Sequence, residues 1–103
     1  MHAPTNRPDP LVAIRQAHQF RAILDVLEEY RTGNDQTFYR WLANLGLAIS
    51  RRDLAELFDR LDNAGLTSST RVESIRVISL TSDGSEVARG IVRLDWIAAP
   101  ELG

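Results

Sequence analysis

Residues 46–90 read GLAISRRDLAELFDRLDNAGLTSSTRVESIRVISLTSDGSEVARG, and the order of signals in this stretch decides the fold. Ser50 is a typical residue for the start of a helix, and Gly65 is typical of the position just beyond a helix end. Between them the apolar residues recur at helical spacing: Leu54, Leu57, Phe58 and Leu61. The pattern predicts an amphipathic helix over residues 50–64.

After Gly65 the helical period ends, and residues 66–80 are rich in β-branched and small polar residues. Such a composition favours two short strands, with residues 75–80 as the stronger one and Ser74 and its neighbours at the hairpin tip. Thr81 then caps a short helix that ends at Gly90.

Two more helices are predicted upstream. Asp9 is a plausible N-cap before Pro10, and apolar residues at helical spacing extend that helix to Tyr30, where residues 32–34 end it. Asn34 or Asp35 starts the next helix, which ends at Gly46. Its apolar positions, together with Phe58 of the following helix, are expected in the core: Phe38, Trp41, Leu42 and Leu45.

The resulting order is helix, helix, helix, strand, strand, helix. This order predicts a mainly α fold with a small β-hairpin, the winged helix-turn-helix. We expect a flexible arm over residues 1–10, the winged-helix domain over residues 11–92 and a partly docked tail over residues 93–103. Trp96 in that tail is expected to pack on its own domain or on a second copy of the chain.

Composition narrows the function classes. The 103 residues carry a net charge of −2, no cysteine and no lysine, so all 12 basic residues are arginine. Thiolate chemistry and lysine-based catalysis are therefore excluded. The N-terminus lacks the apolar core of a signal peptide and no apolar run is long enough to cross a bilayer, so we expect a cytoplasmic protein of a bacterial cell with no membrane partner.

Catalysis is not expected. The two histidines, His2 and His18, have no carboxylate at metal-binding or triad spacing, and no glycine-rich phosphate loop is present. We therefore predict a protein that is not an enzyme and that needs no cofactor and no metal.

The candidate functional residues lie in the predicted helix of residues 50–64 and the predicted hairpin of residues 66–80. In helix-turn-helix proteins the start of the recognition helix enters the major groove, where arginine can bond guanine and free amides favour phosphate. Small Ala55 allows close approach, and wing arginines can reach the DNA backbone. The predicted DNA-binding residues are Ser50, Arg51, Arg52, Ala55, Arg60, Arg71 and Arg76.

Several of these arginines also have a structural interpretation that involves no DNA. Arg52, Glu56 and Arg60 lie at i, i+4 and i+8 and can form exposed pairs along a solvated helix. The wing arginines can protect an edge strand from aggregation. Residues 50–65 carry three arginines against four carboxylates, which opposes phosphate binding.

Several motifs resemble known winged-helix proteins. LFDRLDNAGL (57–66) and LTSDGSEVA (80–88) resemble the winged-helix transcription regulators of the multiple-antibiotic-resistance and phenolic-acid-repressor types. A closer resemblance is to small proteins encoded by Mu-like bacteriophages and prophages, and it covers residues 20–92. The shared elements are Ile23-Leu24 with Leu27, Asn34, Gly46-Leu47 with Ser50-Arg51, and Leu80-Thr81 with Gly84, Val87, Ala88 and Gly90.

The resemblance implies a winged-helix fold and a DNA-binding or phage-regulatory role, without catalytic residues. The leading hypothesis is a phage- or prophage-encoded transcriptional regulator that binds double-stranded DNA as a homodimer. The alternative is a winged-helix protein–protein interaction module, a phage accessory or assembly factor that contacts a phage or host protein and does not bind DNA.

Overall fold

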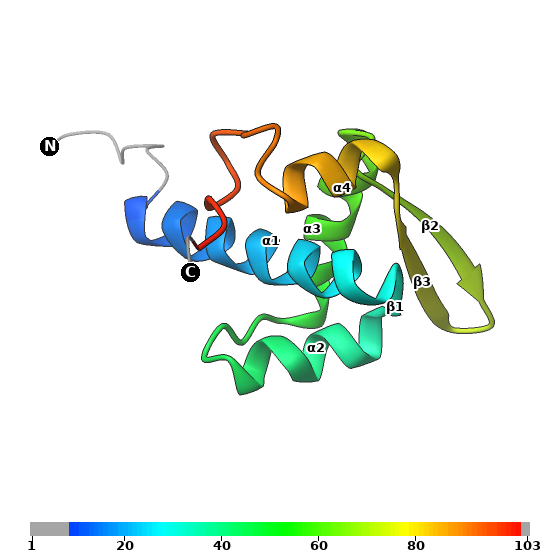
Figure 1. The fold of residues 1–103 in the computed structure, drawn as a ribbon. Helices are drawn as coiled ribbons and strands as arrows, with labels where there is room; N and C mark the ends of the chain where they lie inside the picture. Colours follow the sequence, from blue (N-terminus) through cyan, green and yellow to red (C-terminus); the bar gives the residue numbers. More distant parts are fainter. Residues whose placement is uncertain (1–8, 102–103) are drawn as a thin grey trace, which may run out of the picture.

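Four helices and one antiparallel sheet make up the computed structural model, which describes residues 9–101 (Figure 1). The elements in chain order are α1 (Pro10–Tyr30), β1 (Thr32–Asn34), α2 (Asp35–Asn44), α3 (Arg51–Asn63), β2 (Thr67–Val72), β3 (Ile75–Leu80) and α4 (Ser82–Ala88). Helix α1 crosses the middle of the molecule, and the β2–β3 hairpin projects from the end opposite the start of α1 (Figure 1). The predicted arm of residues 1–10 lies almost entirely outside the described residues.

The helix starts follow the predicted caps. In each case the side-chain oxygen of the residue before the helix accepts a hydrogen bond from a backbone amide of the first turn, which satisfies a donor that has no partner within the helix. The four pairs are Asp9 with Leu11, Asn34 with Thr37, Ser50 with Asp53, and Thr81 with Gly84. Gly46, Gly65 and Gly90 have φ of 77°, 78° and 78°, the left-handed backbone that glycine tolerates after a helix.

The sheet differs from the expected one by a third strand. Residues 32–34, which were expected only to end the first helix, form β1 and pair with β3, so the strand order is β1-β3-β2. Arg31, with φ of 70°, turns the chain out of α1 and into this strand. The order α-α-α-β-β-α is therefore wrong by one element, because a three-residue strand has no periodicity that a sequence could show.

The core forms where α1, α2, α3 and the sheet meet. The fully buried large side chains are Phe20, Ile23, Leu24, Leu27, Phe38, Leu42, Phe58, Leu61 and Ile78. Phe38 and Phe58 meet edge to face with ring centres 5.7 Å apart. The expectation that Trp41 and Leu45 are also core residues is wrong, since Trp41 is 41% exposed and Leu45 is 46% exposed.

The first two turns of α1 are apolar but uncovered. Leu11, Val12 and Ile14 are 73%, 50% and 55% exposed, because the helix projects beyond the elements that pack on its second half. No helix within residues 9–101 is both long enough and apolar enough to cross a membrane.

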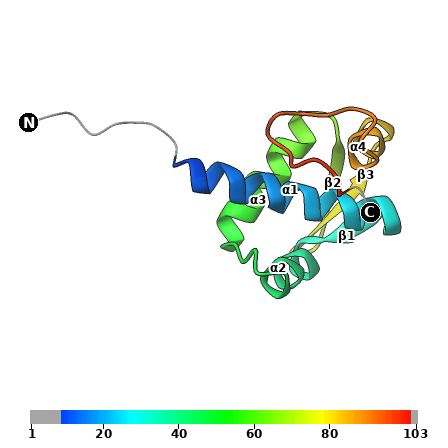
Figure 2. The same cartoon turned by 60° about the vertical axis from the view of Figure 1, so that its left-hand side comes forward.

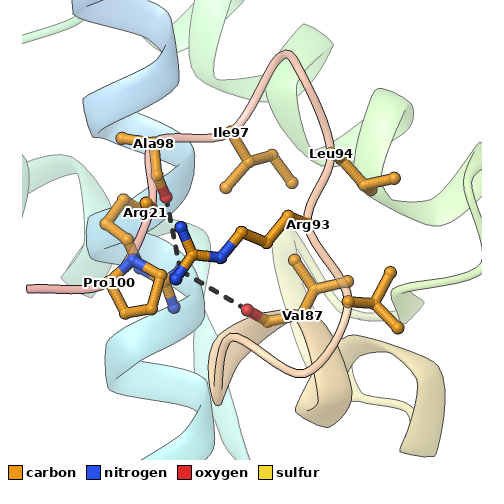
Figure 3. A pocket seen from close by; sticks show the side chains of 9 residues that line it. Arg21, Val87, Arg93, Leu94, Ile97, Ala98 and Pro100 are labelled. Atoms are coloured by element: carbon orange, nitrogen blue, oxygen red, sulfur yellow. Dashed lines mark hydrogen bonds between the residues drawn. The ribbon is translucent and has the colours of Figure 1, made fainter.

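The segment after α4 folds back over α1 (Figure 2). Trp96 meets Phe20 edge to face at 4.8 Å, and the amide of Ala98 donates to the carbonyl of Ala17 at 3.0 Å. The Arg21 guanidinium, buried in α1, donates to the carbonyls of Val87 and Ala98 (Figure 3). Because these bonds span three parts of the chain, they fix the C-terminal segment against α1 and α4.

Gly84 marks the closest approach between α4 and the sheet. A Cβ atom at this position would lie 2.0 Å from the backbone oxygen of Leu66 and 2.7 Å from Cδ1 of Leu80. The same Leu66 oxygen accepts the amide of Thr81, so it cannot move freely.

We therefore expect Gly84→Ala to lower the free energy of unfolding by about 1–3 kcal/mol, the usual cost of overpacking. Urea denaturation measures the change. Ser82→Ala, an exposed substitution in the same helix, is the control. Equal stability of the two variants would contradict this packing.

Candidate nucleic-acid interface

The start of α3 presents two arginines to solvent. Ser50 caps the helix by accepting from the amide of Asp53 at 3.0 Å, which leaves the earlier amides of the first turn directed outward. The side chain of Arg52 is 89% exposed. The guanidinium of Arg51 stacks on the ring of Tyr39 in α2, 4.1 Å from the ring centre. This cation–π contact restrains Arg51 without occupying its hydrogen-bond donors.

Four of the predicted site residues come together in one cleft between α3 and the wing. The cleft has a volume of about 90 Å³. Its lining includes Arg51 and Ala55 from α3, and Arg71 and Arg76 from the two wing strands. Arg71 is exposed and its guanidinium reaches the carbonyl of Ser74 at 3.5 Å. Asp35 also lines the cleft. Among the described residues, the cleft arginines free of a carboxylate partner are therefore Arg51 and Arg71, on either side of the small Ala55.

Arg76 differs from the other arginines because internal partners occupy its side chain. The side chain is 12% exposed, and its Nη2 atom lies 2.9 Å from carboxylate oxygens of both Asp59 and Asp62. Its Nε donates to the hydroxyl of Ser69 at 3.0 Å, and Nη1 donates to the carbonyl of Ala55 at 3.4 Å. Arg76 therefore joins β3 to β2 and to α3.

The backbone of Arg76 adds a link to α2. Its amide donates to Oδ1 of Asp35, the first residue of α2, at 3.3 Å. Helices α2 and α3 and both strands of the wing thus meet at one residue, which sets the angle between α3 and the wing.

Asp62 is the acidic partner most enclosed in this network. Its side chain also accepts from the hydroxyl of Thr67. Burial opposes ionisation of Asp62, but the hydrogen bonds from Ser69, Thr67 and Arg76 and the charge of Arg76 outweigh it, so the pKa of Asp62 is lowered from its ordinary value. The carboxylate is accordingly ionised when the network forms.

Arg60 lies apart from the cleft. Its guanidinium covers the ring of Trp96, 4.1 Å from the ring centre, and reaches 5.7 Å from the centre of Phe20. Among the seven predicted residues, Arg60 is the one that faces the C-terminal segment. Arg60 lies more than two helical turns beyond Arg52, so its side chain is near the opposite end of α3 from the cleft.

Three of the four carboxylates of α3 have partners. Asp59 and Asp62 pair with Arg76, and Glu56 lies 3.9 Å from Arg52. An exposed pair at that distance is weak. The acidity that opposes DNA binding is therefore partly neutralised by an arginine from the wing.

Sequence reasoning missed Tyr39 and Asp35 as contributors to this surface. Tyr39 lies off the apolar stripe of α2, a position from which a partner in α3 cannot be deduced. Asp35 was recognised only as a possible cap, a role that Asn34 fills. Within residues 9–101, no three side chains of histidine, aspartate or glutamate are grouped so that they could hold a metal ion.

One solved structure, described as the complex structure of hsRosR-S4, has a similar fold. It superposes with a TM-score of 0.54 over 85% of this chain and 86% of that chain, at 15% sequence identity. At this identity the likeness concerns the fold, and it confirms the predicted winged helix-turn-helix. No protein-family model matches the chain, and no curated protein matches its sequence.

The Asp62 network predicts a pH dependence of stability. Because the pKa of Asp62 is lower in the folded chain, its contribution is fully present above the unfolded pKa of about 3.9 and is lost as the pH falls through the folded pKa. We expect the urea midpoint of the wild type to fall more steeply below about pH 4 than that of Asp62→Asn.

The control is Asp95→Asn, which removes an exposed carboxylate with no ion pair or hydrogen bond among the described residues. If Asp62→Asn lost stability with the same slope as the wild type, the network would not hold the Asp62 carboxylate in its ionised form.

Proposed function

We propose that this protein binds double-stranded DNA through α3 and the wing. The observation that carries the proposal is the cleft in which Arg51, Ala55 and Arg71 converge beside the exposed Arg52. The winged helix-turn-helix fold supports it, because this fold presents its second helix to the major groove.

The residues of this surface have different roles in the proposed DNA binding. Arg52, whose side chain extends freely from the first turn of α3, is suited to a base edge or a phosphate. Arg51 is restrained by Tyr39, and Arg71 flanks the same cleft from the wing, so both are placed for the backbone. Ser50 and the first amides of α3 add a helix N-terminus, which favours a phosphate.

Arg76 and Arg60 contribute indirectly in this proposal. Arg76 sets the position of the wing and neutralises Asp59 and Asp62, so that the carboxylates left nearest the start of α3 are Asp53 and Glu56. Arg60 holds the C-terminal segment through Trp96. This distribution explains how a chain with net charge −2 can carry a local basic surface.

Transcriptional regulation, a phage or prophage origin and a homodimeric state are further parts of the proposal. The first two come from the sequence resemblance at residues 20–92, and the third belongs to the leading hypothesis drawn from the sequence. The gene neighbourhood tests the first two, since a regulator gene lies beside a divergent promoter and an assembly gene lies in a late structural operon. Sedimentation equilibrium tests the third.

The double variant Arg51→Ala plus Arg52→Ala tests DNA binding directly. With random-sequence DNA pools at low salt, we expect the variant to bind at least about tenfold more weakly than the wild type. The slope of log affinity against log salt should fall by about 1–2, because each lost phosphate contact removes about one released counterion.

The matched control is Arg89→Ala plus Arg93→Ala, which removes the same charge from the α4 side of the molecule. We expect nearly wild-type affinity for this variant. Circular dichroism should show that both double variants stay folded. If the two double variants bound DNA with equal affinity, α3 would not be the element that contacts DNA.

A second candidate function is a protein-interaction module without DNA affinity. The exposed apolar side chains of Leu11, Val12 and Ile14 favour it, because such a patch marks a contact with another protein or a second copy. A wild-type chain that binds no DNA at any salt concentration would favour this function over the first.

A further inference from the structure

A wide cavity is lined by α1, β1 and the side of α2 that carries Trp41. It has a volume of about 520 Å³, within the roughly 300–1,000 Å³ of small-molecule sites. Its walls include three aromatic rings, from Tyr30, Phe38 and Trp41, and the aliphatic side chain of Val26. None of the residues proposed to contact DNA lines it.

One carboxylate accompanies the rings. Glu29 lies one turn after Asp25 and Val26 on α1, lines the cavity, and forms no ion pair with any residue in the range 9–101. No arginine lines this cavity. Arg40 lines an adjoining hollow of about 300 Å³, which shares Asn34, Thr37 and Trp41 with this cavity.

The cavity continues along the two helices. A second hollow of about 260 Å³ shares Val26, Glu29 and Trp41 with the first and adds Asp25 and Leu45. Both hollows thus combine apolar side chains with Glu29, and no basic side chain lines either of them. Asp25 is partly committed, because its Oδ1 lies 2.8 Å from Nη2 of Arg21, which leaves Glu29 as the available charge.

The exposure of the rings fits a surface that a ligand covers. Trp41 is 41% exposed and Tyr30 is 65% exposed, although both are large and lie on helices that face each other across the groove. Gly33 also lines the cavity, and a Cβ atom at this position would lie 2.7 Å from Cε2 of the Phe38 ring.

We infer that this groove binds an organic cation with aromatic or apolar substituents. Aromatic ring faces attract a cation that has lost part of its water, and a nearby carboxylate adds a charge of the right sign. An anion of the same shape finds no positive group on the walls that carry Glu29, since Arg40 lines the adjoining hollow on the other side of Trp41. A neutral apolar molecule would use the rings but would leave Glu29 without a partner.

The two tryptophans allow a site-resolved test. Trp41 lies in the groove, whereas Trp96 packs between Phe20 and Arg60 on the C-terminal segment. Their indole N–H signals in a ¹⁵N–¹H spectrum of the full chain report on the two places separately. A Trp96→Phe variant assigns the signals.

Tetraphenylphosphonium is a suitable probe, and tetraphenylborate is its counterpart of the same shape and opposite charge. We expect tetraphenylphosphonium to shift the Trp41 signal in a saturable way and to leave Trp96 in place. Glu29→Gln should weaken this binding about fivefold, the effect of one nearby charge in a largely hydrated setting. Glu86→Gln, an exposed carboxylate on α4, is the matched control and should bind as the wild type does.

Three results would overturn the inference. They are the absence of a saturable Trp41 shift with tetraphenylphosphonium, an equal shift with tetraphenylborate, and unchanged affinity in Glu29→Gln. The experiment contains no DNA, so its outcome is independent of the proposed function of α3 and the wing.

Discussion

The position of the wing relative to α3 depends on Arg76. Its side chain reaches Asp59, Asp62 and the Ala55 carbonyl of α3, and its amide reaches Asp35 of α2. A charged side chain that is only 12% exposed is stable when its donors are satisfied, and here two carboxylates, a hydroxyl and a carbonyl satisfy them. One network therefore sets the geometry of the whole candidate interface.

A second buried arginine performs the same task for the rest of the molecule. Arg21 bonds the carbonyls at the end of α4 and the carbonyl of Ala98, while Trp96 covers Phe20 and receives Arg60 on its face. The C-terminal segment thus covers the part of the core that α1 and α3 form. Arginine suits both networks, because its planar group can serve several acceptors at once and can stack on rings.

The electrostatic character of the surface follows from these pairings more than from total charge. Arg51 and Arg71 line the cleft between α3 and the wing, and the exposed Arg52 lies beside it. Glu29 and Asp25 lie with Trp41 in the groove between α1 and α2. Helix α2 separates the two surfaces, with Tyr39 under Arg51 on one of them and Trp41 on the other. The charged side chains that add up to the net charge of −2 therefore lie on different surfaces of the molecule.

The sequence by itself determined the helices, their caps and the hairpin, because Asp9, Asn34, Ser50 and Thr81 act on residues only two or three positions away. It also pointed to the start of α3, where Arg51 and Arg52 follow the cap. Only the tertiary structure decided that β1 exists, that Trp41 stays exposed and that Arg76 turns inward. Those outcomes depend on contacts between residues distant in the chain, such as Arg76 with Asp35, and no local pattern records which partner a long side chain will meet.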